Sequence, residues 1–123
     1  MNNRFNFRMW DINTKRFYYM YLDELIGLTR TISIPKEATI QQYTGLTDSN
    51  DKEIYEGDIL MYKSGSIPTT GVIGQVLYEA DEGGYIFQWE RKGPNQHHIN
   101  LNCDVAFESV IIGNIFETPQ LLK

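Results

Sequence analysis

Cysteine and long apolar runs are both scarce in this sequence, and each shortage excludes a class of protein. The one cysteine, Cys103, rules out an intrachain disulfide. No segment approaches the roughly 18 apolar residues that a membrane-spanning helix needs, and the first residues lack the apolar core of a secretory signal. We therefore expect a cytoplasmic protein without a membrane partner.

Clustered positive charge is also missing. The 123 residues include 11 Lys and Arg against 16 Asp and Glu, which gives a formal net charge of −5. Because binding to a phosphate backbone depends on clustered Lys and Arg, this composition disfavours nucleic acid as the partner. Nucleic acid would gain support only if folding gathered the scattered basic residues on one face: Arg4, Arg8, Arg16, Lys63 and Lys92.

Proline and glycine, at 4 and 10 residues, are too few for a long linker, so residues 1–123 are expected to form a single domain. A hydrophobic content of 41% excludes a disordered chain. The aromatic residues, 6 Phe, 8 Tyr and 2 Trp, favour strands, where large rings pack on a pleated surface.

Alternating apolar and polar residues predict a mainly β fold. Residues 4–10 alternate between an apolar set, Phe5, Phe7 and Met9, and a polar set that includes Arg8. Further strands are expected at residues 16–21, 31–34, 38–43, 59–63, 72–79, 85–89, the start of 97–108, and 110–116.

Turn and helix signals separate these strands. Turns are expected at residues 48–51, 81–84 and 93–96, where Asp, Asn, Ser, Gly or Pro cluster. Short helices are expected after Asp23 and from Thr118-Pro119. The second half of 97–108 is expected to continue the strand or to form a loop. Together these signals predict a small, partly open antiparallel barrel or pseudo-barrel with one or two short helices.

The central stretch, residues 42–62, contains the densest group of acids. The pattern of a calcium-binding loop starting at Asp48 does not match, because Glu53 occupies the position that needs glycine and Ile59 the position that needs glutamate. Gly57 favours a bend, and Asp58 could accept backbone donors there. Glu56 and Asp58 could form a general acid/base pair, but we favour a solvated turn.

The other chemistry-bearing residues also have a structural interpretation. His97 and His98 are adjacent on an expected strand and so point to opposite faces, which prevents them from holding one metal together. Cys103 is expected in the core as a small apolar side chain. Gly83-Gly84 lacks the Lys and Ser/Thr of a phosphate loop. We therefore predict no catalytic residue, no metal site and no cofactor.

Several aromatic residues could instead form an exposed stacking platform for single-stranded nucleic acid. Basic residues do not alternate with these rings, so we favour core packing for them. The set is Trp10, Tyr18, Tyr43, Trp89 and Phe116.

Four stretches occur in a recognisable order: FRMWD at 7–11, QYTGLTD with KEIYEGDI at 42–48 and 52–59, VIIGNIFE at 110–117, and PQLL at 119–122. Together they resemble the YopX family, small proteins encoded by phages and bacterial prophages. Asp51 stands where the family often has Gly, and Phe116 where Tyr is usual. The resemblance implies a mainly β pseudo-barrel and carries no established activity.

These observations predict a non-enzymatic interaction protein of phage or prophage origin in the cytoplasm of a bacterial host. Its partner would be an unidentified host or phage protein, with a homo-oligomer as a further option. Nucleic-acid binding in phage DNA or RNA metabolism ranks second. A small hydrolase using Glu56, Asp58 or the His97-His98 pair ranks third.

Overall fold

The computed structural model describes residues 6–20, 38–63, 71–89 and 97–122. The described strands of the first sheet are β1 (Phe7–Asp11), β2 (Arg16–Met20), β3 (Thr39–Thr47) and β4 (Glu53–Tyr55). Those of the second sheet are β5 (Asp58–Tyr62), β6 (Val72–Glu79), β7 (Gly84–Trp89), β8 (His97–Asn100) and β9 (Ser109–Asn114). The helical segments are η1 (Ala80–Glu82), α2 (Cys103–Phe107) and η2 (Pro119–Leu122).

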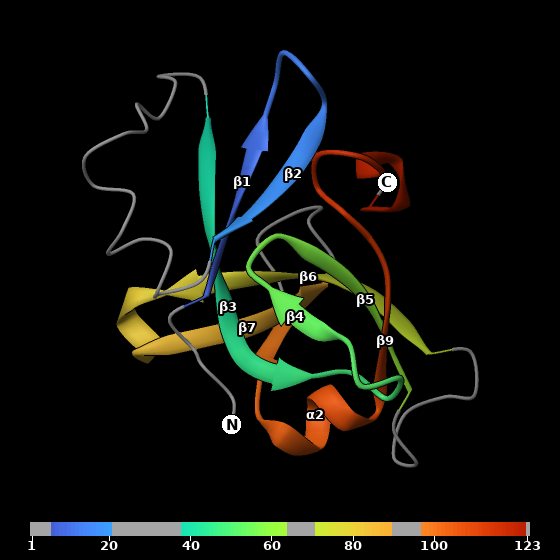
Figure 1. The fold of residues 1–123 in the computed structure, drawn as a ribbon. Helices are drawn as coiled ribbons and strands as arrows, with labels where there is room; N and C mark the ends of the chain where they lie inside the picture. The colour runs from blue at the N-terminus through green and yellow to red at the C-terminus, as the bar shows by residue number, and fades with distance from the viewer. Residues whose placement is uncertain (1–5, 21–37, 64–70, 90–96, 123) are drawn as a thin grey trace.

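Both sheets are antiparallel, with strand orders β2-β1-β3-β4 and β8-β7-β6-β5-β9. Figure 1 shows the first sheet crossing the second steeply, so that together they form a half-barrel. Strand β3 curves strongly along its length (Figure 1), and its pairing with β4 shifts register between Tyr43 and Thr47. The mainly β, antiparallel fold predicted from the sequence is confirmed.

The hydrophobic core lies between the sheets and is closed at one end by α2. On β5, Leu60 and Tyr62 point inward, as the alternation of a strand requires. They meet side chains of β4, β6 and β7 and of the segment around α2: Ile54, Val76, Phe87, Leu101, Val105 and Ala106.

Strand β1 buries the face opposite to the predicted one. Phe7 is only half-buried, whereas Arg8 and Trp10 are 4% and 8% exposed. The charged side chain can lie inside because it has a buried anionic partner and an aromatic environment, which offset the cost of removing it from water. The prediction that the Arg8 face is solvated was therefore wrong.

The prediction of a strand or loop for the second half of 97–108 was also wrong, because residues 103–107 form α2. The side chain of Asn102 accepts from Val105 N at 2.9 Å and caps the helix. The helical repeat buries Val105 and Ala106 and leaves Cys103 exposed. Cys103 is consequently not the core residue that strand alternation predicted.

The segment after β9 forms one 3-10 turn, η2, which packs against β6 and β9. The backbone of Gly113 leaves space for Thr118 and Leu121, and a Cβ at this position would collide with them. The helix predicted after Asp23, the strand at 31–34 and the turn at 93–96 lie outside the described residues. In the described part of the chain, no helix combines the length and hydropathy needed to cross a membrane.

Candidate binding pocket

A pocket of about 440 Å³ opens between the β1–β2 hairpin, the turn before β4 and strand β9. Its deepest side chains are charged and buried, its walls are aromatic, and its mouth carries exposed charges. The described residues that line it are Arg8, Phe17, Tyr19, Lys52, Glu53, Tyr55, Asp58, Ile111, Gly113, Asn114 and Glu117.

An ion pair forms the floor of the pocket. Arg8 Nη2 lies 2.8 Å from Asp58 Oδ1, and the two side chains are 5% and 3% exposed. Arg8 Nε donates to Gln41 Oε1 at 2.8 Å, and Nη2 also donates to the carbonyl of Glu56 at 3.2 Å. These bonds direct the guanidinium towards the start of β5 and satisfy much of its hydrogen-bonding capacity.

Two aromatic rings contact the Arg8 guanidinium. Its central carbon lies 4.3 Å from the centroid of the Phe17 ring and 4.9 Å from that of Tyr55. Tyr19 packs edge-on against Tyr55, with the centroids 5.7 Å apart. The walls are therefore surfaces on which a guanidinium already stacks favourably.

Asp58 follows a tight bend, and its side chain stabilises that bend. Gly57 has a φ of 89°, which glycine adopts without steric cost, and Asp58 Oδ2 accepts from Tyr55 N at 2.8 Å. Burial raises the pKa of Asp58 from 3.8 to about 6, although Arg8 and the Tyr55 hydrogen bond act to lower it. The predicted role of Asp58 as a backbone acceptor is confirmed, but the prediction that it is solvated was wrong.

Asn114, the cross-strand partner of Asp58, orients Glu117 at the rim of the pocket. Its Oδ1 accepts from Phe116 N at 3.0 Å and from Glu117 N at 2.9 Å, and its Nδ2 donates to Glu117 Oε1 at 2.7 Å. The Tyr55 hydroxyl donates to the second rim carboxylate, at Glu53 Oε1, over 3.4 Å. Both rim carboxylates therefore have a side-chain partner that orients them.

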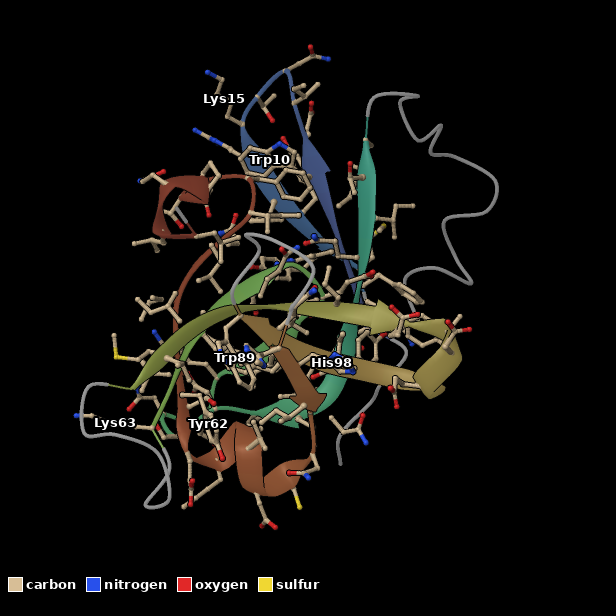
Figure 2. The ribbon with its side chains drawn as sticks, turned by 180° about the vertical axis from the view of Figure 1, so that it is seen from behind. Trp10, Lys15, Tyr62, Lys63, Trp89 and His98 are labelled. Carbon is tan, nitrogen blue, oxygen red and sulfur yellow. The ribbon has the colours of Figure 1, made fainter. Side chains whose placement is uncertain are left out.

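A second, open hollow of about 580 Å³ shares Glu117 with the first. Trp10 and Phe116 stack there with centroids 5.1 Å apart and planes 7° apart, beside the exposed Ile12. Figure 2 shows Trp10 between the β1–β2 hairpin and the C-terminal turn. Glu117 lines both hollows, and we refer to the two together as the recess.

The remaining candidate residues lie away from this recess. His97 stacks on Trp89 with centroids 5.8 Å apart, and His98 Nε2 lies 3.3 Å from Glu82 Oε1 (Figure 2). No group of three or more His, Cys, Asp or Glu side chains within the described ranges could hold a metal ion. Glu56 reaches the pocket floor through its backbone carbonyl, and it is not among the residues that line the pocket with Asp58.

The aromatic residues considered as a stacking platform do not share an exposed surface. Trp10 and Tyr43 are buried, Trp89 and Phe116 are half-buried, and Tyr18 is exposed. Core packing is thus confirmed for Trp10 and Tyr43.

The five basic residues whose gathering on one face would have supported nucleic-acid binding do not share an exposed face as a set, because Arg8 is in the interior. Arg16 and Lys63 are exposed, while Arg4 and Lys92 lie outside the described residues. Arg8 therefore does not contribute to an exposed basic surface.

Comparison with protein families identifies relatives of the chain. The family model described as YopX protein matches residues 20–123. The chain belongs to the YopX family. Three of the four stretches noted in the sequence fall within the matched region, and FRMWD at 7–11 precedes it.

The YopX fold has a solved counterpart. The crystal structure of protein EF1440 from Enterococcus faecalis superimposes with a TM-score of 0.58 at 21% identity, covering 96% of this chain and 97% of that chain. At this identity the likeness shows the fold alone. A search among curated proteins gave no match.

The sequence did not reveal the pocket. Its floor joins Arg8 to Asp58, and alternation on β1 assigned Arg8 to the solvent face. The available signal was the resemblance itself, because both residues fall within the family stretches FRMWD and KEIYEGDI.

Proposed function

We propose that this YopX protein is a non-enzymatic interaction module of phage or prophage origin that binds a host or phage protein in the bacterial cytoplasm. The observation that carries the proposal is the state of the buried charges in the pocket. Asp58 has Arg8 on one carboxylate oxygen and Tyr55 N on the other. With a partner on each oxygen, this carboxylate helps to maintain the shape of the recess.

The form of the recess favours a macromolecule over a small substrate. Small-molecule sites usually enclose most of their ligand, whereas the two hollows are open and share Glu117 as a lining residue. Large side chains stand exposed at their edges, with Tyr19 at 48% and Ile12 at 54%. Exposed aromatic and aliphatic side chains around a recess are typical of protein interfaces.

Self-association is the second candidate, favoured by a row of apolar side chains across the second sheet. Met61 pairs with Ile73 on β6 and with Val110 on β9. Ile73 and Val110 are each 38% exposed. Light scattering across a concentration series tests this option. A dimer that Val110→Lys converts to a monomer supports it, and a wild-type monomer at every concentration removes it.

Affinity capture from host lysate, with and without nuclease, tests the main proposal. Two exposed tyrosines provide matched variants, because each packs edge-on against another tyrosine: Tyr19 on Tyr55 at the pocket, and Tyr78 on Tyr85 on the other sheet. We expect one protein to survive nuclease treatment, to bind Tyr78→Ala as it binds wild type, and to be lost with Tyr19→Ala.

Three results would contradict the proposal. Capture that disappears with nuclease would identify nucleic acid as the partner. A captured protein that is insensitive to Tyr19→Ala would place its binding site elsewhere. Capture of nothing by the folded wild-type protein would leave self-association or a small-molecule substrate as the basis of function.

A further inference from the structure

The charges that line the pocket do not balance. The described lining residues include three acids, Glu53, Asp58 and Glu117, and two bases, Arg8 and Lys52. Arg8 and Asp58 neutralise each other at the floor. The mouth is left with two carboxylates against one ammonium group, on a protein whose formal net charge is already −5.

The walls of the pocket are chemically suited to a cation. The negative faces of aromatic rings attract guanidinium and ammonium groups, and Phe17 and Tyr55 already hold the guanidinium of Arg8. The ring of Tyr19 extends this wall to the exposed mouth, where it is 48% exposed. A cation bound at the mouth therefore meets the ring of Tyr19 as well as the two rim carboxylates.

The two carboxylates are also oriented before any ligand arrives. Asn114 Nδ2 donates to Glu117 Oε1 at 2.7 Å, and the Tyr55 hydroxyl donates to Glu53 Oε1 at 3.4 Å. Prior orientation lowers the entropy lost on binding. These contacts distinguish the mouth from an ordinary acidic surface, where long side chains move independently.

We propose that the pocket binds a basic side chain, an arginine or lysine, projecting from the partner protein, with Glu53 and Glu117 as its charge partners and Tyr19 as its aromatic wall. This inference rests on the interaction function proposed above and specifies the chemistry of its partner. The pocket volume of about 440 Å³ lies within the range of sites that hold compact ligands. The neighbouring hollow beside Trp10 and Phe116 leaves room for the rest of the partner segment.

Nuclear magnetic resonance titration with short peptides tests the proposal on the full chain. The probes are blocked pentapeptides with a central arginine, lysine or citrulline between glycines, since citrulline keeps the shape of arginine without its charge. We expect the arginine and lysine peptides to shift the backbone amides of Tyr55, Gly113 and Asn114 in a saturable manner. The citrulline peptide should bind at least about tenfold more weakly, a difference of about 1.4 kcal/mol.

Paired charge variants separate local recognition from overall attraction. Glu53→Gln with Glu117→Gln removes both rim charges, and Glu79→Gln with Glu82→Gln removes two charges near the turn between β6 and β7. Both pairs change the formal net charge equally. We expect the first pair to weaken arginine binding about threefold to tenfold, as for two partly exposed ion pairs, and the second pair to bind like wild type.

Three outcomes would overturn the inference. They are equal binding of the arginine and citrulline peptides, equal weakening by both variant pairs, and a stronger response of the pocket amides to a single-stranded oligonucleotide. If capture from lysate still depends on Tyr19 in any of these cases, the interaction function stands and only the cationic chemistry fails. If capture does not depend on Tyr19, the interaction function proposed for the pocket fails as well.

Discussion

Arg8 Nη2 and Asp58 Oδ1 lie 2.8 Å apart and connect the two sheets. Arg8 is on β1 of the first sheet, and Asp58 begins β5 of the second. The bonds of Arg8 to Gln41 and of Asp58 to Tyr55 N extend this pair into β3 and β4. The pair therefore fixes how the sheets meet and forms the floor of the pocket at the same point. The stability of the protein and the shape of the pocket therefore depend on the same ion pair.

Removing the cation should destabilise the protein strongly. Arg8→Met leaves the Asp58 carboxylate buried without its partner, and we expect a loss of about 3–5 kcal/mol of unfolding free energy at pH 7. Adding Asp58→Asn to Arg8→Met should recover part of this loss, because the uncompensated charge is gone. Urea unfolding measures both values.

The control is Arg16→Met, on the exposed strand of the same hairpin, which should stay within about 0.5 kcal/mol of wild type. An equal loss in the single and double variants would show that Arg8 acts through packing alone.

The raised pKa of Asp58 predicts a specific pH dependence. In the native state the Asp58 carboxyl keeps its proton up to about pH 6, whereas in the unfolded chain it releases the proton near pH 3.8. The native state thus binds more protons between these values, so the contribution of Asp58 to stability is fully present below about pH 4 and declines as pH rises through 6. Two pKa units correspond to roughly 3 kcal/mol.

Urea unfolding of wild type and Asp58→Asn between pH 4 and 7.5 isolates this contribution, because the other titrating groups are common to both proteins. We expect the unfolding free energy of wild type, relative to the variant, to decrease with rising pH. A relative stability that increases with pH would show that Arg8 and the Tyr55 hydrogen bond outweigh burial.

Asp48 should be the most sensitive residue of the central turn. Its buried carboxylate accepts from Asn50 N at 2.8 Å, Lys52 N at 2.9 Å and Ile111 N at 3.0 Å. Asp48→Ala removes three charge-assisted hydrogen bonds, and we expect a loss of more than about 3 kcal/mol. Asp51→Gly is the control in the same turn: Asp51 has a φ of 63°, so glycine fits and stability should change by less than about 1 kcal/mol.

Thermal or urea unfolding distinguishes the two variants. Similar losses in Asp48→Ala and Asp51→Gly would mean that the turn tolerates no change at all, and the specific role of the Asp48 carboxylate would have to be abandoned.

Three glycines provide a graded test of backbone strain. A Cβ at Gly57 would collide with Gln41 Nε2 at a φ of 89°, Gly83 has a φ of 71° with open space around it, and Gly84 has open space without positive φ. We expect Gly84→Ala to be nearly neutral, Gly83→Ala to lose about 1 kcal/mol, and Gly57→Ala to lose more than about 2 kcal/mol.

The Gly57 variant should also disturb the pocket, because Gln41 is the partner of Arg8 Nε. Unfolding free energies rank the three variants, and the amide shifts of Tyr55 and Asn114 report the pocket. A Gly57→Ala protein as stable as Gly83→Ala would show that Gln41 moves aside without cost.

Much of the strand layout could be predicted because alternation and turn chemistry are local. The prediction for 72–79 coincides with β6, and the bend at Gly57 with Asp58 as acceptor is present. The left-handed backbone of Asp51 explains why the family often has glycine there.

The pocket was hidden because it depends on pairing between distant segments. Alternation on β1 defines two faces, and the choice between them was decided by an ion pair with Asp58 that lies beyond local sequence. The helix α2 was missed for a different reason. It has five residues, and its main signal is the single cap Asn102.

The place of β5 between β6 and β9 affects the protein while it is being synthesised. β6 is the next strand along the chain, but β9 follows β7, β8 and α2. In a nascent chain that has emerged only as far as Trp89, β5 can pair with β6 on one side only. The other edge of β5, which contains the apolar residues Ile59, Leu60 and Met61, is unpaired. An open apolar edge pairs readily with another chain. Ribosomes that pause before Ser109 would therefore favour aggregation of the nascent protein, whereas rapid completion of β9 would prevent it.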